Sequence, residues 1–252
     1  MLAAERRKLI MEQLLNDKRV LVSELSREYD VSEETIRRDL EHLSLEGKVI
    51  KTYGGAVLDE HLSIDLPFNL RQKENTEGKQ RIAELASKEI NDGEHIFLDA
   101  STTAIFIAKN IKQKRDLTVI TNSVENVLEL ADAEGVNVIC TGGVLKPDLM
   151  SFSGNKTLDA INSYYGDKVF LSCKGFSLHK GATDGKEDVA GIKLNMIHSA
   201  AVTYLVADST KFNKAGFAKI CDLRDIDVVI TDKEPPMEWK RAFEENNIRL
   251  VY

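Results

Sequence analysis

VSEETIRRDL, at residues Val31–Leu40, is the stretch that decides the fold of the first part of the chain. Ser32 stands immediately before a helical run, where its hydroxyl is placed to accept a hydrogen bond from a free backbone N–H group. Two glutamates follow it in the first turn, where carboxylates interact favourably with the helix dipole. Ile36, Leu40 and Leu43 recur at helical spacing and form one apolar stripe. We therefore predict an amphipathic helix with one face for packing and one for contact.

A second, shorter helix is predicted just upstream of this one. It spans Ser23–Tyr29 and is joined to the first through a turn at Asp30–Val31. Two helices at this close spacing are typical of a helix-turn-helix, in which the second helix enters the major groove of DNA. The alternative is an ordinary pair of surface helices whose Arg37 and Arg38 side chains are merely solvated.

The residues after the helix favour DNA binding. Gly47 is a helix stop, and Lys48–Tyr53, Gly54–Gly55 and Ala56–Val57 are typical of a strand, a glycine turn and a returning strand. This arrangement is a winged helix-turn-helix, whose wing carries groups suited to phosphates. We expect two residues to contact bases and the others to contact the DNA backbone or cap the helix. The predicted DNA-binding residues are Thr35 and Arg38 for the bases, with Ser32, Arg37, Lys51 and Tyr53.

The N-terminal pattern as a whole resembles the DeoR family of bacterial transcription regulators. The residues that carry the resemblance are Arg7 to Leu9, Ser32, the run TIRRDL from Thr35 to Leu40, Gly47, and the run YGGA from Tyr53 to Ala56. The resemblance implies a regulator that binds double-stranded operator DNA.

Charge is an argument against this interpretation. The formal net charge is −7, and residues 1–57 hold 10 Lys/Arg against 11 Asp/Glu, so this domain lacks the usual basic excess. DNA binding then depends on cations gathered on one face, which predicts a modest affinity that falls as the salt concentration rises. A dimer would double the number of contacts with DNA. The cations expected to converge are Arg6, Arg7, Arg37, Arg38, Lys48 and Lys51.

Composition limits the other possibilities. The chain has 252 residues, 42% of them hydrophobic, which is enough to bury a core. No apolar run reaches the length of a membrane span and the N-terminus has no signal-peptide core, so we expect a cytoplasmic protein. Cys140, Cys173 and Cys221 are too far apart to indicate a disulfide or a zinc cluster. We expect no metal and no other cofactor.

The regular pattern lapses between residues 58 and 75, where polar residues surround an isolated Pro67. We interpret this segment as a linker. The predicted domains are therefore a DNA-binding domain at residues 1–57 and a larger domain at residues 76–252.

Helices and strands alternate through the larger domain. Short apolar strands without polar alternation indicate a parallel sheet covered on both faces, so the predicted class is an α/β doubly wound domain. The predicted strands are Glu94–Leu98, Leu117–Ile120, Val136–Cys140, Lys168–Ser172, Ala201–Ala207 and Asp227–Ile230, and the predicted helices are Thr76–Ile90, Thr102–Ile111, Val124–Ala131, Lys156–Tyr164, Lys186–His198 and Met237–Glu245.

Small, hydroxylated or charged residues follow five of these strands. The carboxyl ends of parallel strands line one crevice, so we expect these residues to converge on one polar ligand. Hydroxyl groups at a helix start favour a phosphate. Taken singly, each segment is more often an ordinary turn or helix cap, and it is the five together that favour a ligand site. The predicted ligand-binding residues along the strand ends are Asp99, Ser101, Thr102, Thr103, Thr121, Asn122, Thr141, Gly142, Gly143, Lys174, Gly175 and Lys211.

This second half resembles the DeoR-family sensor domain, which is similar to ribose-5-phosphate isomerase. The resemblance implies a phosphorylated sugar or polyol as effector, and it adds Thr183 and Asp184 in the run Gly181–Asp184 to the sugar-facing edge. It also supplies an alternative, an aldose–ketose isomerase with a carboxylate base near Lys180, Asp184 or Glu187. The isomerases carry an acid-rich segment where this chain has a lysine and a thiol, at Cys173–Gly175. The complete catalytic set is therefore not expected, and we favour a binding pocket without turnover.

Together these predictions describe a homo-oligomeric repressor of a sugar or polyol utilisation operon, released from DNA by a phosphorylated sugar. A third possibility is an adaptor that uses the winged helix to bind protein. That adaptor would have no affinity for DNA even at low salt.

Overall fold

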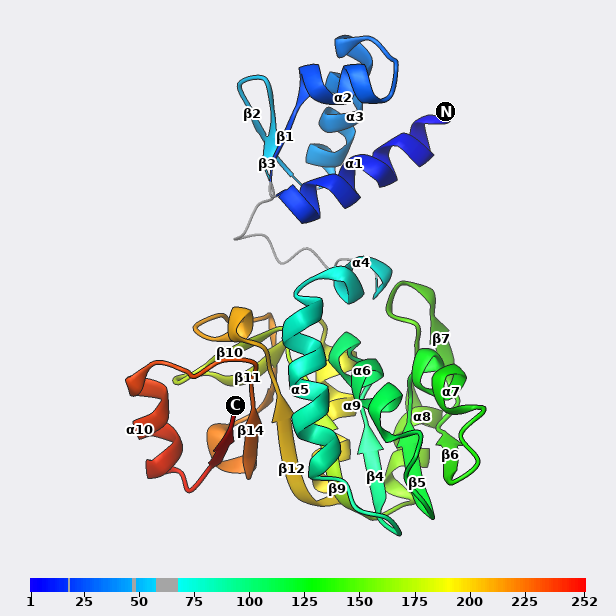
Figure 1. Ribbon diagram of the computed structural model, residues 1–252, viewed down its shortest axis with the longest axis vertical. Helices are drawn as coiled ribbons and strands as arrows, with labels where there is room; N and C mark the ends of the chain where they lie inside the picture. The colour runs from blue at the N-terminus through cyan, green and yellow to red at the C-terminus, as the bar shows by residue number, and fades with distance from the viewer. Residues whose placement is uncertain (18, 47–48, 58–67) are drawn as a thin grey trace. The chain divides into compact units, whose positions relative to one another are not determined.

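The computed structural model describes residues 1–17, 19–46, 49–57 and 68–252. The chain divides into two compact units, Met1–Glu74 and Asn75–Tyr252, and each is described by itself (Figure 1). The predicted helix stop at Gly47, the wing residue Lys48 and most of the predicted linker lie outside the described residues.

The first unit is a winged helix-turn-helix, as predicted. A three-stranded antiparallel sheet with the order β1-β3-β2 stands beside the helices. In the described part of the wing, β2 begins at Ile50 and does not include Val49. The elements are α1 (Ala3–Asp17), β1 (Arg19–Leu21), α2 (Val22–Glu28), α3 (Glu33–Leu45), β2 (Ile50–Thr52), β3 (Gly55–Val57) and α4 (Phe68–Lys73).

The predicted apolar stripe of the recognition helix α3 forms the centre of this unit. Ile36, Leu40 and Leu43 are at most 2% exposed and belong to a core contributed by α1, α2, α3 and the strands. The core also holds Ile10 and Leu14 of α1, each 0% exposed. Burial of this stripe fixes which face of α3 points outward.

Helix α4 lies in the segment that was predicted to be a linker. It spans six residues, and Phe68 at its start is 3% exposed. A helix of this length gives no helical repeat in the sequence, so periodicity cannot indicate it.

The second unit is an α/β domain in which helices and strands alternate. Helices α6 and α10 and strand β6 have the predicted bounds, and the other predicted elements differ by one or two residues at their ends. Its elements are α5 (Thr76–Lys88), β4 (His95–Leu98), α6 (Thr102–Ile111), β5 (Leu117–Thr121), α7 (Val124–Leu130), β6 (Val136–Cys140), β7 (Val144–Lys146), η1 (Pro147–Leu149), β8 (Ser151–Ser153), α8 (Asn155–Asn162), β9 (Gly166–Leu171), β10 (Gly175–Ser177), β11 (Gly181–Asp184), α9 (Glu187–His198), β12 (Ala200–Val206), η2 (Ser209–Lys211), β13 (Ala218–Cys221), η3 (Leu223–Asp225), β14 (Val228–Ile230), α10 (Met237–Glu245) and β15 (Arg249–Val251).

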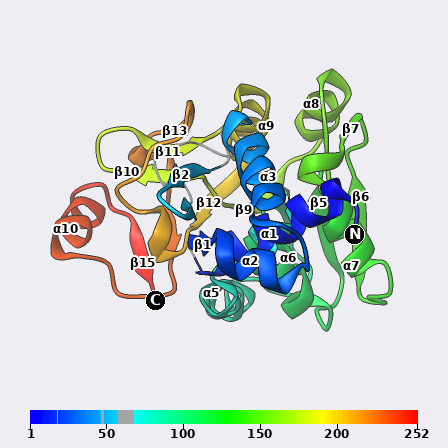
Figure 2. The ribbon, with the colours of Figure 1, turned by 90° about the horizontal axis from the view of Figure 1, so that it is seen from above.

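A seven-stranded sheet with the order β15-β14-β12-β9-β4-β5-β6 forms the centre of this unit, and its neighbouring strands pair in parallel. Helices α5, α6 and α7 cover one face, and α8 and α9 cover the other (Figure 2). This confirms the predicted doubly wound class.

Several strands of this unit were not predicted. Strands β7 and β8 form a hairpin, β10, β11 and β13 form a small antiparallel sheet, and β15 adds an edge to the main sheet. Most of them are three residues long, too short for a strand repeat to stand out.

The strand order fixes where a ligand site is expected. From the adjacent pair β4 and β9, the chain winds outward in opposite directions, through β5 and β6 on one side and through β12, β14 and β15 on the other. The carboxyl ends of β4 and β9 are therefore the switch point of the sheet, the place where open α/β domains bind ligands.

Candidate functional site

The start of the recognition helix is capped as predicted. Ser32 has an extended backbone, with φ −64° and ψ 150°, and its Oγ accepts a hydrogen bond from the Thr35 backbone N–H at 3.2 Å. The two hydroxyl oxygens, Ser32 Oγ and Thr35 Oγ1, lie 2.9 Å apart. Ser32 therefore orients Thr35, one of the predicted base-contacting residues, as well as capping the helix.

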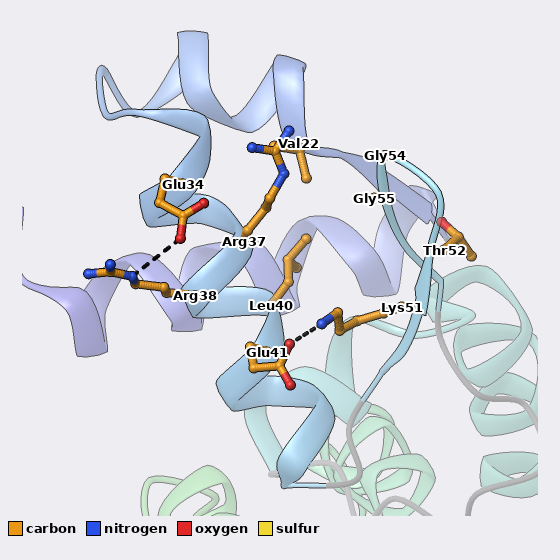
Figure 3. Close-up of a pocket in the computed structure, with 10 residues that line it drawn as sticks. All are labelled: Val22, Glu34, Arg37, Arg38, Leu40, Glu41, Lys51, Thr52, Gly54 and Gly55. Atoms are coloured by element: carbon orange, nitrogen blue, oxygen red, sulfur yellow. Dashed lines mark hydrogen bonds and ion pairs between the residues drawn. The ribbon is translucent and has the colours of Figure 1, made fainter.

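A groove of about 400 Å³ lies between α3 and the wing (Figure 3). Its walls come from the exposed face of α3 and from β2, the turn and β3. It is lined by Val22, Glu34, Arg37, Arg38, Leu40, Glu41, Lys51, Thr52, Gly54 and Gly55. Of the predicted DNA-binding residues, the groove includes three, while the Tyr53 ring is fully exposed at the tip of the wing.

The predicted DNA-contacting cations of this surface are each paired with a carboxylate. Arg37 Nη2 lies 2.6 Å from Glu33 Oε2, and Arg38 Nε lies 3.5 Å from Glu34 Oε1. Lys51 of β2 forms an ion pair with Glu41 of α3, which joins the wing to the helix (Figure 3). These side chains are roughly half to four-fifths exposed. Exposed pairs of this kind are weak, so DNA phosphates can displace the carboxylates at little cost.

Arg6 does not belong to the DNA-facing cations, contrary to the expectation that it converges with them. Its Nε donates to Asp39 Oδ2 at 2.6 Å, and the two side chains are 8% and 7% exposed. The pair joins α1 to α3. A helical arginine near the N-terminus looks like a surface residue in the sequence. Arg6 is buried instead, because its partner Asp39 lies on the packed side of α3.

Asp99 lies at the switch point of the second unit and joins the two strand ends. Its Oδ1 accepts a hydrogen bond from the Ser101 backbone N–H at 3.1 Å, and its Oδ2 accepts one from the Ser172 N–H at 3.0 Å. Ser101 follows β4 and Ser172 follows β9. The Asp99 side chain is 1% exposed.

Lys193 of α9 reaches the same point and was not among the predicted site residues. Its Nζ lies 2.7 Å from the Ser172 carbonyl oxygen, 2.7 Å from Asp184 Oδ2 and 3.2 Å from Asp99 Oδ2. Burial lowers the pKa of Lys193, but attraction by Asp184 and Asp99 outweighs this, so its pKa is raised and it stays charged. Lys193 thus joins Asp99 to Asp184.

The start of α6 directly follows Asp99. Ser101 caps this helix, because its Oγ accepts a hydrogen bond from the Ala104 N–H at 3.1 Å. Thr102 and Thr103 occupy the first turn, where backbone N–H groups have no intrahelical partner. The three predicted hydroxyl residues therefore stand together at a positive helix end, beside the switch point.

Thr121 and Asn122, at the end of β5, take part in a buried network. Thr121 Oγ1 donates to the Leu98 carbonyl at 2.6 Å and accepts from the Ser123 N–H and from Asn126 Nδ2. Asn126 also donates to the Asp99 carbonyl, at 2.9 Å. Within the described residues, the Oδ1 atoms of Asn122 and Asn126 are buried without a hydrogen-bond partner. Asn126, which was not predicted, lies beside the Asp99 loop, whereas the Asn122 amide donates to the Phe152 carbonyl.

The glycines after β6 have a backbone role. Gly142 and Gly143 have φ values of 62° and 120°. A Cβ atom on Gly143 would lie 2.2 Å from Thr157 Oγ1 and 2.7 Å from the Ser153 carbonyl oxygen. Thr157 Oγ1 donates to the Gly142 carbonyl at 2.7 Å. The close approach to α8 and β8 explains Gly143, and the positive φ explains Gly142, without requiring a ligand.

Thr183 and Gly175 also have local partners. Thr183 Oγ1 donates to the Gly175 carbonyl at 2.9 Å and accepts from the Gly216 N–H at 2.7 Å. A Cβ atom on Gly175 would lie 2.6 Å from the Lys214 carbonyl group. These contacts hold β10 and β11 against residues 214–216.

Lys211 and Cys173 lie close to the Lys193 cluster. Burial raises the pKa of the Cys173 thiol to about 12, and both Lys193 and Lys211 act on it electrostatically in the opposite direction. Lys211, at the end of η2, forms no ion pair within the part of the chain that the structure describes. It is therefore the predicted cation best placed to meet an anion, whereas Lys174 is half-buried and its backbone N–H donates to the Thr183 carbonyl.

The residues of the isomerase alternative do not form a clear acid–base pair. Glu187 and Lys180 are exposed, and Asp184 is tied to Lys193. Among the described residues no three His, Cys, Asp or Glu side chains are arranged to hold a metal ion. No helix in the described ranges is long and apolar enough to cross a bilayer.

Comparison with known proteins identifies both parts of the chain. A model of the DeoR-like helix-turn-helix domain matches residues 6–61, and a model of the DeoR C-terminal sensor domain matches residues 74–233. The chain belongs to the DeoR family. This confirms the predicted family, and with it the function as a DNA-binding transcriptional regulator with a sensor domain, ahead of the isomerase alternative.

Two regulators of Bacillus subtilis align over nearly the whole chain. The uncharacterized HTH-type transcriptional regulator YulB of Bacillus subtilis (strain 168) is 40% identical, over 100% of this chain and 97% of its own. The HTH-type transcriptional repressor GlcR of the same organism is 33% identical, over 98% and 95%. A solved ribose 5-phosphate isomerase from Methanocaldococcus jannaschii aligns with a TM-score of 0.42 and 15% identity, over 55% of each chain.

Proposed function

We propose that this DeoR-family regulator is a cytoplasmic repressor of a sugar or polyol utilisation operon, and that a phosphorylated sugar or polyol releases it from DNA. The observation that carries the effector class is the arrangement at the sheet switch point. Ser101, Thr102 and Thr103 stand at the start of α6, next to Asp99, and Lys211 lies near the same cluster. Helix starts of this kind favour phosphate groups.

The direction of regulation is supported by the name of a relative. GlcR, which covers almost the whole chain, is named a transcriptional repressor. A reporter gene under the promoter of the regulated operon tests this part. Repression predicts that deleting the regulator raises expression in the absence of the sugar, whereas an activator would lose expression on deletion.

The mechanism of release is a two-state linkage. A ligand that binds better to the DNA-free form must lower DNA affinity by the same factor, typically about 5- to 150-fold. Two DNA-binding units per dimer would raise the affinity of a surface whose cations are balanced by acids. We therefore propose a homo-oligomer on a palindromic operator, which sedimentation of the protein with and without operator DNA tests.

On DNA, Thr35 and Arg38 contact base edges, and Arg37, Lys51 and Tyr53 contact the backbone, with Ser32 holding Thr35. Arg38 is four-fifths exposed on the outward face of α3, and Lys51 lies across the groove on the wing. Bidentate contacts from arginine to guanine discriminate between bases, whereas lysine contacts to phosphate do not.

Sugar binding at the switch point requires no turnover. Titration of the protein with pentose and hexose phosphates and with their unphosphorylated counterparts tests the effector class, and binding only of the phosphorylated compounds supports it. Turnover of any of these compounds that is abolished by Glu187→Gln would favour the isomerase instead. Glu187→Gln that leaves DNA release unchanged fits a binding pocket.

A further inference from the structure

Lys193 is a deeply buried cationic side chain near the sensor site, and the proposed function assigns it no role. Its side chain is 8% exposed, and it approaches Asp99 and Asp184, which are 1% and 16% exposed. Burying a charge costs several kcal/mol unless partners compensate for it. A lysine at this place in α9 therefore needs a reason beyond packing.

The contacts of the ammonium group are with the protein itself. Its Nζ donates to the Ser172 carbonyl and to Asp184 Oδ2, and it forms an ion pair with Asp99 Oδ2. Lys193 therefore acts through the groups that it holds.

One of these groups is a liability for anion binding. The Asp99 carboxylate accepts a hydrogen bond from the Ser101 N–H, so its negative charge lies at the start of α6, where the proposed phosphate binds. Without compensation, that charge would repel an anion. Lys193 supplies a positive charge 3.2 Å from Asp99 Oδ2.

We propose that Lys193 is a positioning residue of the effector site, which neutralises Asp99 beside the α6 N-terminus and ties it to Asp184, so that the site accepts a phosphate. This inference rests on the proposed effector class and adds the electrostatic device behind it. The three side chains carry a formal charge of −1 in the native protein. Lys193→Met changes this to −2, and Asp184→Asn together with Lys193→Met restores −1.

The test uses inorganic phosphate as the probe and the thermal stabilisation of the full-length protein as the readout of affinity. Lys193→Met is expected to lower phosphate affinity at least about ten-fold, since one unit of charge is removed within a partly buried site. The double variant Asp184→Asn/Lys193→Met is expected to recover most of that loss. Lys193→Arg keeps the charge and is expected to retain phosphate binding.

A matched control is available at the opposite end of the same strands. Lys168 of β9 is also largely buried, at 13% exposure, and pairs with Glu94 at 2.6 Å, at the amino ends of the strands. Lys168→Met is expected to leave phosphate affinity unchanged. If Lys193→Met does not fold, the single variant Asp184→Asn provides the test. It changes the formal charge of the cluster from −1 to zero and is expected to strengthen phosphate binding several-fold.

The outcomes separate this inference from the proposed function. Phosphate affinity that is equal in wild type and Lys193→Met would overturn the role of Lys193 and leave the effector class in place. Loss in Lys193→Met without recovery in the double variant would also overturn it, because a purely structural role predicts that pattern. A wild-type protein that binds neither inorganic phosphate nor any sugar phosphate would overturn both.

Discussion

Replacement of Asp39 by asparagine should destabilise the DNA-binding unit selectively. The Arg6–Asp39 pair is buried, with side chains 8% and 7% exposed and an Nε–Oδ2 distance of 2.6 Å. Removing one partner of a buried pair costs roughly 3–5 kcal/mol, because the other charge is left uncompensated. Asparagine keeps a hydrogen-bond acceptor for Arg6, so we expect about 3 kcal/mol. For a small unit with a urea m-value near 1 kcal/mol/M, this lowers the unfolding midpoint by about 3 M.

The assay can separate the two units within the full chain. The single tryptophan, Trp239, is fully buried in the second unit, so its fluorescence follows that unit, while far-UV circular dichroism follows the helices of both. Asp39→Asn should shift the circular dichroism transition and leave the fluorescence transition in place. The control Glu34→Gln removes an exposed pair and should cost less than about 0.5 kcal/mol. Coincident circular dichroism curves for Asp39→Asn and wild type would refute the reasoning.

Three further predictions concern charged side chains. Arg38→Ala should relax sequence preference in anisotropy titrations, whereas Lys51→Ala should weaken specific and random DNA alike and flatten the salt dependence; equal losses on both DNAs for Arg38→Ala would remove it from base readout. Glu41→Gln frees Lys51 from its ion pair and should raise affinity for random DNA about 2- to 10-fold at low salt, and an unchanged affinity would show that the carboxylate does not compete with phosphate. A hydrogen bond from Arg249 holds the pKa of Glu89 below its usual 4.5, so this pair stabilises the fold above that pH and its contribution is lost as the pH falls through the lowered value. Urea unfolding of Glu89→Gln and wild type should therefore differ above pH 4.5 and converge as the pH falls through the lowered pKa of Glu89, and a difference that persists unchanged in stronger acid would contradict this.

The fold was largely predictable because it is set by repeats in the sequence. The stripe of Ile36, Leu40 and Leu43 and the bounds of α6 and α10 follow from helical spacing and capping residues, and the structure has them as predicted. Strand β1 and helix α4 were missed because three or six residues carry no measurable repeat.

The details of the sites were less predictable because they depend on contacts between distant segments. Arg6 and Lys193 both look like surface residues in the sequence, but each is buried and paired with a carboxylate from another element. The partner of Arg6 is Asp39, 33 residues away, and a partner of Lys193 is Asp184, 9 residues away. The sequence of α9 does not indicate that Lys193 is buried, since one lysine among apolar residues normally extends its ammonium group to solvent. The strand-end rule did locate Asp99, because topology fixes that position regardless of side-chain contacts.

Fluorescence anisotropy on DNA from upstream of the regulated operon tests the central claim most directly. The protein is titrated onto this DNA and onto a scrambled duplex, with and without a panel of sugar phosphates and their unphosphorylated counterparts. A sequence-specific regulator released by a phosphorylated sugar should prefer the upstream DNA and should lose about 5- to 150-fold in affinity with one phosphorylated compound. No preference for the upstream DNA at any salt concentration, or specific binding that none of the phosphorylated compounds weakens, would contradict the account.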